Sequence, residues 1–352
     1  MTKRLITNRS GALHSRLGVA AAVLLALGAA LAPHPAPAAG DPPVLGLPIQ
    51  CSLGSDCWVV NLVDLDTSKG IRDYKCGKNS YDGHKGTDIA IRDLAAMREG
   101  VPVIASAAGI VFGVRDGMKD VSFRKVGTEY LKGRDCGNGV TLRHPDGWET
   151  QYCHLRSGSV SVVKGGRIKA GQQLGLVGHS GLSEFPHIHL SVRYRGKVVD
   201  PFVGVQRKSQ CEAGKDSLWA IPLRAALGAG ETAIYHSGFA AKAPKSEAIR
   251  AGLHNTKILP KDAPALVLWT DIFRIRKGDR LRLRLVDPEG SVIAKKDFVM
   301  PKVPVRHVVY LGKKKKALSW PVGRYRGEVT LTRGQEVDGR RTYKVIREVE
   351  IQ

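Results

Sequence analysis

The chain has 352 residues, which is enough for two domains once an N-terminal leader is set aside. Its hydrophobic content of 43% is ordinary for a globular protein, whereas its formal charge of +23 at pH 7 is far from balanced. No segment after the leader is long and apolar enough to cross a bilayer, which excludes a protein built on membrane spans.

The first 39 residues are expected to be a signal peptide. An Ala/Leu-rich apolar stretch over residues 17–31 follows four basic residues, Lys3, Arg4, Arg9 and Arg16. Small residues at 36–39 favour cleavage near Ala39 or Gly40. An uncleaved anchor is the alternative, but the apolar core is short for a span of about 20 residues. Export would place the protein in the periplasm, or in the cell wall or medium of a cell without an outer membrane.

The mature chain divides in composition near residue 215. Residues 40–214 carry a net charge of +5, and residues 215–352 carry +14. We therefore predict two domains over these ranges, with the basic character concentrated in the second.

The first range is typical of an all-β domain, because short β-branched runs alternate with glycine-rich turns and helical periodicity is almost absent. Strands are predicted over residues 102–107, 109–114, 140–144, 149–154, 167–169, 174–178 and 187–193. Pro145-Asp146-Gly147 indicates a hairpin turn. The basic segment from Arg115 to Gly137 is long for a loop in a compact domain, and we expect it at the rim of a site.

The second range is also predicted to be β. A strand is predicted over residues 280–286, and the strict alternation of arginine and leucine over residues 280–285 indicates one buried and one cationic face. Further strands are predicted over residues 265–269, 292–299, 305–311, 324–332 and 341–351. About seven short strands in some 120 residues favour an immunoglobulin-like sandwich.

Six cysteines in an exported chain indicate disulfides. Six cysteines allow 15 pairings, so the sequence does not fix the connectivity. Local pairings such as Cys51–Cys57 and Cys136–Cys153 are candidates. A cysteine-rich zinc site is disfavoured because the sequence has no C-x-x-C pair.

Two short motifs about a hundred residues apart indicate a metal site. His84 and Asp88 form H-x-x-x-D, and His187 and His189 form H-x-H in a run with strand character. Side chains at i and i+2 of a strand share a face and lie roughly 6–7 Å apart. One histidine can thus bind a metal while the other stays free beside it, as in a catalytic zinc site with an open position. Alone, His-x-His more often marks a polar strand face.

Residues 83–201 resemble the LytM/lysostaphin-type zinc metallopeptidases, a family of peptidoglycan endopeptidases. The resemblance rests on a series of short segments in the same chain order: His84-Lys85-Gly86-Thr87-Asp88, Val103-Ile104-Ala105, Gly109-Ile110-Val111, Gly137-Asn138-Gly139-Val140, Tyr152-Cys153-His154-Leu155, Lys169-Ala170-Gly171-Gln172, Leu174-Gly175 and Pro186-His187-Ile188-His189-Leu190. It covers about a third of the chain and excludes the second domain.

The resemblance implies roles for five residues. His84, Asp88 and His189 would bind one zinc ion per chain, and His154 and His187 would be the catalytic histidines. A neutral imidazole can take a proton from water and return it to a leaving amine because its pKa lies near neutral pH. The H-E-x-x-H signature is absent, so no glutamate base is implied.

For four other residues in this range we expect roles other than zinc binding or catalysis. For His144 and His179 we expect structural or surface roles, although the family usually has a small residue where His179 stands, so a substrate contact is an alternative. Glu184 and Phe185 are bulkier than the small residues the family commonly carries there, and could reshape one wall of the cleft.

The expected function is that of a secreted zinc-dependent endopeptidase that hydrolyses peptide bonds of peptidoglycan stems or cross-links. The alternative is an envelope regulatory or binding protein that uses a peptidase fold to control other wall hydrolases, with the 115–137 segment or the second domain covering the cleft. A β-domain adhesin with an incidental zinc is a third interpretation.

The basic clusters of the second domain are the lysines at 313–316 and the arginines of residues 274–284. Such clusters are often solvated faces, and the sharper hypothesis is an electrostatic tether to an anionic envelope polymer. Nucleic acid is not an expected partner, because the leader exports the chain and aromatic residues are not interleaved with the basic ones. We expect a monomer.

Overall fold

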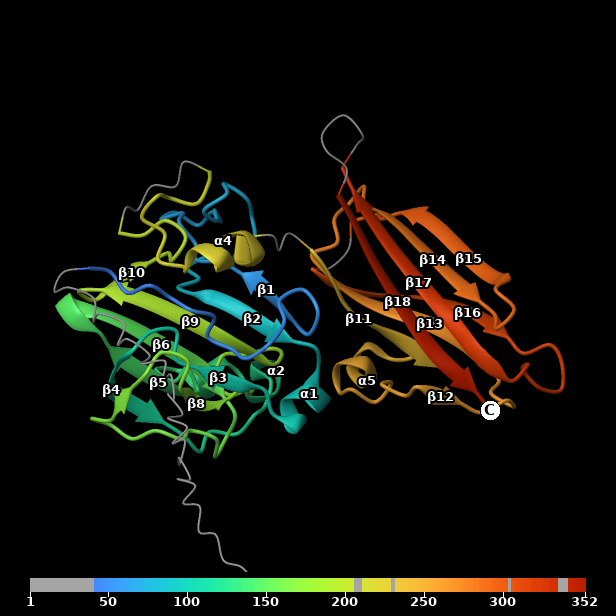
Figure 1. Ribbon diagram of the computed structural model, residues 1–352, viewed down its shortest axis with the longest axis horizontal. Coiled ribbons are helices and arrows are strands. Elements are labelled where there is room, and N and C mark those ends of the chain that lie inside the picture. The colour runs from blue at the N-terminus through green and yellow to red at the C-terminus, as the bar shows by residue number, and fades with distance from the viewer. Residues whose placement is uncertain (1–40, 206–210, 229–231, 303–304, 335–340) are drawn as a thin grey trace, which may run out of the picture. The chain divides into compact units, whose positions relative to one another are not determined.

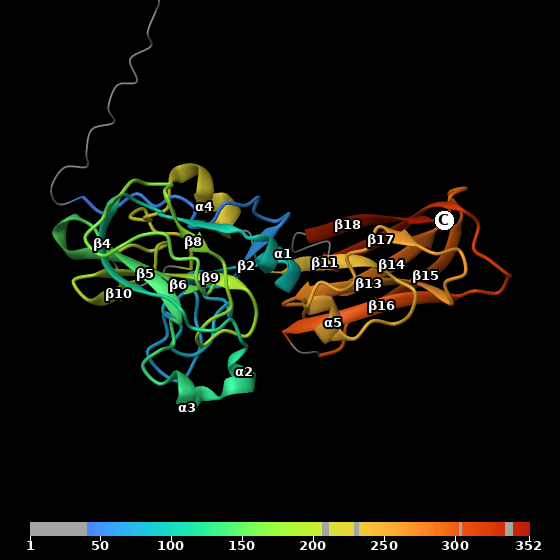
Figure 2. The same ribbon diagram turned by 90° about the horizontal axis from the view of Figure 1, so that it is seen from below.

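The fold is taken from a computed structural model, which describes residues 41–205, 211–228, 232–302, 305–334 and 341–352 (Figures 1 and 2). The predicted signal peptide lies outside these ranges. Within them, no helix has the length and apolar character to cross a bilayer.

The first half is built on one antiparallel sheet with strand order β1-β2-β9-β6-β5-β4-β7, and β10 pairs with β9. The strands in chain order are β1 (Cys57–Asn61), β2 (Thr87–Ile91), β4 (Gly109–Arg115), β5 (Asn138–Arg143), β6 (Trp148–Leu155), β7 (Arg167–Ile168), β9 (His187–Tyr194) and β10 (Lys197–Val199). A second, two-stranded sheet joins β3 (Pro102–Ile104) to β8 (Gln173–Leu176).

Helices are few and short. They are α1 (Leu94–Glu99), α2 (Phe123–Val126), α3 (Thr128–Leu131), α4 (Ile221–Gly228), α5 (Ser246–Arg250) and a 3₁₀ turn at Pro145–Gly147. The last of these occupies the predicted hairpin between β5 and β6. The expectation of an all-β protein is therefore confirmed.

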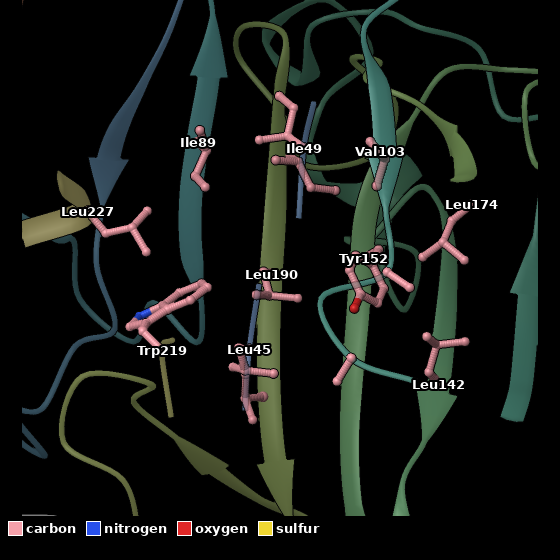
Figure 3. Packing of buried hydrophobic residues seen from close by; sticks show 14 of the residues in the cluster. Leu45, Ile49, Ile89, Val103, Leu142, Tyr152, Leu174, Leu190, Trp219 and Leu227 are labelled. Carbon is pink, nitrogen blue, oxygen red and sulfur yellow. The ribbon is translucent and has the colours of Figure 1, made fainter. Parts of the chain in front are cut away.

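The central strands owe their place to the alternation of their side chains. In β9, Ile188 and Leu190 are fully buried against Tyr152 of β6 and Trp219, in the core shown in Figure 3. Successive residues of a strand point to opposite faces, so His187 and His189 emerge on the other side. The core thus fixes the strand that carries both histidines.

The second half contains two sheets. The first, of order β11-β13-β16, comprises β11 (Ala233–Ala240), β13 (Ala265–Phe273) and β16 (Arg306–Lys314). The second, of order β12-β18-β17-β14-β15, comprises β12 (Ile258–Leu259), β14 (Arg280–Val286), β15 (Val292–Val299), β17 (Gly323–Arg333) and β18 (Arg341–Ile351). Apolar residues from both sheets form a single core cluster, which includes Leu268, Leu283 and Val329. The immunoglobulin-like topology stays a prediction.

The alternation in β14 matches its prediction. Leu281, Leu283 and Leu285 are buried, whereas Arg280 and Arg282 are exposed. Both arginines form ion pairs with the carboxylate of Asp297 on β15. Part of the cationic face is therefore neutralised within the sheet.

Three disulfides join the cysteines. Cys51–Cys57 and Cys136–Cys153 form as the local pairings suggested, and Cys76–Cys211 closes a much longer loop. No free cysteine is found in the described residues. The segment 115–137, expected to be a loop, contains α2 and α3, whose four residues each are too few to leave a helical period in the sequence.

Candidate active site

The two histidine motifs meet where β2 lies beside β9. In this antiparallel pair Asp88 faces His189, and Ala90 faces His187. His84 lies just before β2 and is buried, as are Asp88 and His187, while the side chain of His189 is 14% exposed. The strand register therefore brings together residues that are about a hundred positions apart in the sequence.

Three ligand atoms converge at this point. His189 Nδ1 lies 2.7 Å from Asp88 Oδ1, and His84 Nε2 lies 3.2 Å from the same oxygen and 3.1 Å from His189 Nδ1. Ligands about 2.0–2.1 Å from a tetrahedral zinc ion are separated by roughly 3.3 Å, so this triangle fits one ion after a small expansion. The other group of potential ligands, around Cys51 and Cys57, has both cysteines in a disulfide.

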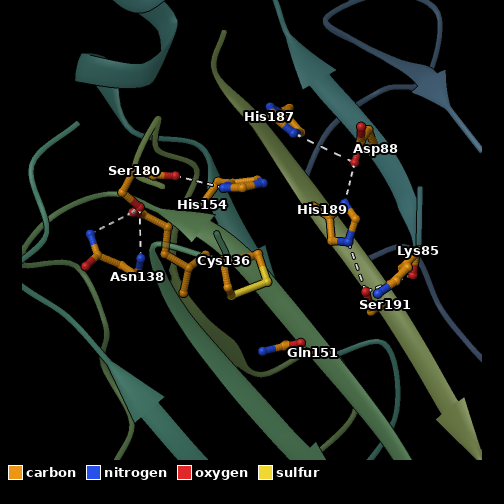
Figure 4. Close-up of a disulfide and its surroundings, with 12 residues drawn as sticks. Lys85, Asp88, Cys136, Asn138, Gln151, His154, Ser180, His187, His189 and Ser191 are labelled. Carbon is orange, nitrogen blue, oxygen red and sulfur yellow. Dashed lines mark hydrogen bonds and ion pairs between the residues drawn. A yellow bond between two sulfur atoms is a disulfide. The ribbon is translucent and has the colours of Figure 1, made fainter. Parts of the chain in front are cut away.

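The outer hydrogen bonds of the two histidines orient their lone pairs toward the triangle. His84 Nδ1 lies 2.6 Å from the carbonyl oxygen of Leu62, which can only accept, so this nitrogen carries the proton. Ser191 donates its hydroxyl proton to the Lys85 carbonyl and is left to accept from His189 Nε2, 2.9 Å away (Figure 4). His84 Nε2 and His189 Nδ1 are thus acceptors facing a carboxylate, an arrangement that a cation stabilises.

The carboxylate of Asp88 is held from its other side. Asn61 Nδ2 donates to Asp88 Oδ2 at 2.8 Å, and Asn61 Oδ1 accepts from Arg274 Nη2 at 2.7 Å. Although burial opposes ionisation, the surrounding histidines hold the pKa of Asp88 well below its usual value. Neither Asn61 nor Arg274 was predicted from the sequence, because neither belongs to a recognisable motif.

His154 and His187 lie beside the triangle with their ring centroids 4.7 Å apart. His154 Nδ1 lies 2.7 Å from the Ser180 carbonyl, and His187 Nδ1 lies 2.8 Å from the Phe185 carbonyl. In both residues Nε2 therefore carries the lone pair, and Nε2 of His187 lies 3.7 Å from Asp88 Oδ1. Burial lowers the pKa of both imidazoles, and that of His154 falls further because His187 is close. Both rings are neutral at pH 7.

A cavity of about 620 Å³ opens on this site. Its wall is formed by His187 and Asp88 together with mostly aromatic and polar residues: Asn61, Ser80, Tyr81, Phe123, Arg124, Leu182, Glu184, Phe185, Arg250, Phe273, Arg274, Val305 and Arg306. Arg124 of α2 forms an ion pair of 2.7 Å with Glu184. The 115–137 segment thus contributes to the cleft through its contact with the loop before His187, as its expected position at the rim implied.

Tyr81 is a residue of this cleft that the sequence reasoning missed. Its ring centroid lies 4.4 Å from that of His84, and it lines the cavity. Desolvation and the nearby carboxylate of Asp88 raise the pKa of its phenol, which therefore stays protonated and able to donate a hydrogen bond. A lone tyrosine three residues before His84 gives no signal on its own.

The other two histidines of this half lie outside the triangle. His144 uses both ring nitrogens, with partners at Ala108 O and Thr150 Oγ1. His179 is buried, and burial lowers its pKa to about 4. Its backbone N–H donates to Asp120 Oδ1, which ties the 115–137 segment to the loop that leads to His187.

Comparison with known proteins gives a consistent set of matches for this part of the chain. Residues 82–201 match the model of Peptidase family M23. The chain is 34% identical over 119 residues to a Haemophilus influenzae protein named "Uncharacterized metalloprotease", covering 34% of this chain and 20% of that protein. It is 33% identical over 120 residues to "DD-carboxypeptidase/endopeptidase Mpg" of Neisseria meningitidis, covering 34% and 22%.

A third relative is "Peptidoglycan DD-endopeptidase ShyA" of Vibrio cholerae, 32% identical over 117 residues, with 33% of this chain and 22% of that protein covered. The chain thus spans about a fifth of the length of the curated relatives it matches. Among solved structures, a zinc containing peptidase from Vibrio cholerae is 22% identical with a TM-score of 0.27, covering 46% of this chain and 39% of that one. A TM-score this low supports no argument about function.

Proposed function

We propose that this chain, whose residues 82–201 match the model of Peptidase family M23, is an exported zinc-dependent endopeptidase that hydrolyses peptide bonds in peptidoglycan stems or cross-links. The observation that carries the proposal is the convergence of His84 Nε2, Asp88 Oδ1 and His189 Nδ1 beside two neutral histidines. A binding protein needs neither feature.

His84, Asp88 and His189 would hold the zinc ion. A bound zinc ion would supply a Lewis acid that lowers the pKa of a water molecule to about 7 and polarises a peptide carbonyl. The hydrogen bonds that His84 Nδ1 donates to the Leu62 carbonyl and His189 Nε2 donates to the Ser191 hydroxyl fix the tautomers that this ligation needs, and Asn61 Nδ2 donates to the carboxylate of Asp88.

His154 and His187 would move the protons. Each carries its lone pair on Nε2 at neutral pH, since Nδ1 donates to a backbone carbonyl, and Nε2 of His187 lies beside the carboxylate of Asp88. One ring can accept the proton of the attacking water, and a ring can return a proton to the leaving amine. The geometry does not distinguish which histidine performs which step, because both lie next to the ligand triangle.

The substrate assignment rests on the relatives and on the compartment. Two of the relatives are named as DD-endopeptidases or as acting on peptidoglycan. The three disulfides of this chain support an oxidising compartment, as the expected signal peptide does. We place the protein in the periplasm or the cell wall, as a monomer. Its basic second half would bind anionic envelope polymers, through charges that the Asp297 ion pairs leave free, such as the lysines at 313–316.

His189→Ala tests the proposal, since it removes a ligand without altering either neutral histidine. We expect loss of zinc, measured by metal analysis, and loss of hydrolysis of purified sacculi. Arg143→Ala is a matched control, because Arg143 is exposed and contacts Glu149 and the ring of Phe112 rather than any of the five site residues. Full hydrolysis by His189→Ala, or by chelated wild-type protein, would contradict the proposal and favour the regulatory alternative.

A further inference from the structure

His154 occupies an irregular position in its strand. In the ladder between β5 and β6, Asn138 pairs with Leu155 and Gly139 pairs with Cys153, so His154 has no partner. Its φ of 65° is in the left-handed region, which is uncommon for a residue other than glycine. An extra residue of this kind is a β-bulge, and bulges next to active sites redirect a side chain.

The bulge is closed by the two cysteines that flank it. The backbone N–H of His154 donates to the carbonyl oxygen of Cys136 at 2.8 Å. Cys136 is in turn bonded to Cys153, the residue directly before His154, with a Cα–Cα distance of 4.7 Å. The disulfide therefore holds both the acceptor of the bulge and the residue at its start.

The backbone next to the disulfide packs closely against β6 and the Ser180 loop. A Cβ on Gly139 would lie 2.8 Å from Cys136 Sγ and 2.6 Å from the Tyr152 carbonyl oxygen. Gly137 has a φ of 64°, and a Cβ there would lie 2.5 Å from the backbone of Ser180. Both glycines are thus required for the close approach of the segment 136–139 to β6 and to the Ser180 loop.

Ser180 aims the ring once the bulge is in place. Its carbonyl lies 2.7 Å from His154 Nδ1, and its hydroxyl accepts from the backbone N–H of Asn138 and donates to Leu155 O. Figure 4 shows one nitrogen of His154 at Ser180 and the ring extending toward His187. Backbone and side chain of His154 are therefore fixed by neighbours that the disulfide ties together.

We propose that the Cys136–Cys153 disulfide is a positioning element for His154, so that turnover depends on this bond while metal binding does not. The inference rests on the proposed peptidase function. None of the three ligand residues lies in the segment 136–139 or in β6. In contrast, both of these segments determine the position of Nε2 of His154. Cys153 does face His189 in the ladder, but a serine there keeps the backbone pairing.

The test compares the zinc-loaded full chain with the double variant Cys136→Ser/Cys153→Ser. The matched control is Cys51→Ser/Cys57→Ser, which removes the disulfide between the segment before β1 and the first residue of that strand. On a cross-linked muropeptide we expect kcat of the first variant to fall at least tenfold, with KM within about twofold of wild type and one zinc per chain. The control should keep wild-type kcat.

A spectroscopic readout separates positioning from a general structural role. The imidazole N–H of His154 that donates to Ser180 should give a protected proton signal in wild-type protein, assigned by its loss in His154→Ala. We expect this signal to disappear in Cys136→Ser/Cys153→Ser and to persist in the control. Wild-type kcat together with a retained signal would overturn the inference, whereas an inactive wild-type protein with bound zinc would instead overturn the proposed function.

If the double variant fails to fold, Gly139→Ala provides a second test of the positioning role of the disulfide. Its methyl group would press on Cys136 Sγ and the Tyr152 carbonyl while leaving the disulfide intact. The same loss of kcat and of the His154 signal, with zinc retained, supports the inference. Wild-type kcat in Gly139→Ala would overturn it.

Discussion

His189 Nδ1 lies 2.7 Å from Asp88 Oδ1, across the pairing of β9 with β2. Both atoms are acceptors when the histidine is neutral and donates its other proton to Ser191. Either a proton on His189 Nδ1 or a metal ion bound to both atoms makes this contact favourable, and the hydrogen bond to Ser191 favours the metal-binding tautomer. Zinc binding should therefore depend on the hydrogen-bond partners of His189 and Asp88.

Ser191→Ala should weaken zinc binding without removing a ligand. The variant leaves His189 Nε2 without its 2.9 Å partner, so the ring is free to adopt the other tautomer. Loss of such an outer partner typically costs about 10–100-fold in metal affinity. Competition with a chromophoric chelator measures the change. Ser161→Ala is the control, because the hydroxyl of this exposed serine donates to the Gln173 carbonyl and contacts no histidine, and it should bind zinc as wild type does.

His154→Ala and His187→Ala should lose activity but keep zinc. Neither residue belongs to the ligand triangle, and removal of a general acid or base typically costs about 10²–10⁴-fold in rate. Metal analysis and initial rates on a muropeptide substrate give the two quantities from one preparation. Equal loss of zinc and rate would instead make these residues ligands.

The stability of the protein should fall as the pH is lowered from about 6.5 toward 4. Burial lowers the pKa of His179 to about 4, against about 6.5 in the unfolded chain, so the unfolded state binds more protons in this window. Unfolding free energy then rises with pH by up to about 1.4 kcal/mol per unit from this group. Urea unfolding of metal-free protein at pH 7 and 4.5 measures it. His179→Gln should show a smaller difference, and an unchanged difference would contradict the assignment.

Leu190→Ala should destabilise the first half. Leu190 is fully buried in the core under β9, and truncation of such a side chain typically costs about 2–5 kcal/mol. Because the same strand carries His187 and His189, we expect weaker zinc binding as a secondary effect. Denaturant unfolding checks the first part. Val163→Ala, which alters an exposed side chain, should leave the midpoint within experimental scatter.

Arg124→Ala tests whether the 115–137 segment restricts the cleft. The Arg124–Glu184 pair is exposed, so its loss should cost less than about 1 kcal/mol of stability. If the segment serves as a wall for substrate, KM rises and kcat changes little. A large increase of kcat/KM would indicate that the segment covers the cleft, as the regulatory alternative requires.

Much of the fold followed from local patterns, and the exceptions have physical reasons. β14 matches its predicted range because its side chains alternate with a clear period of two, whereas β15 matches its range without such alternation. β2 is buried at every position and β11 has a bulge between Ile234 and His236, so neither shows that alternation. The pairing Cys76–Cys211 joins distant segments, which no local pattern specifies.

The sequence indicated five residues that the structure brings together, and their roles stay predictions, whereas it did not indicate the residues that support them. The H-x-x-x-D and H-x-H motifs, taken together in this chain order, indicate a metal site from the sequence alone. Asn61 supports Asp88 through one hydrogen bond, and the bulge at His154 depends on the backbone angle φ of that residue. Neither feature corresponds to a sequence motif. Such features become visible only when the register of the strands is known.

The most direct measurement of the central claim is mass spectrometry of the muropeptides released from purified sacculi by zinc-loaded protein, with chelated protein and His189→Ala in parallel. The account predicts new peptide ends, produced by cleavage within stems or cross-links, with zinc-loaded wild-type protein alone. Identical muropeptides from all three samples would contradict it.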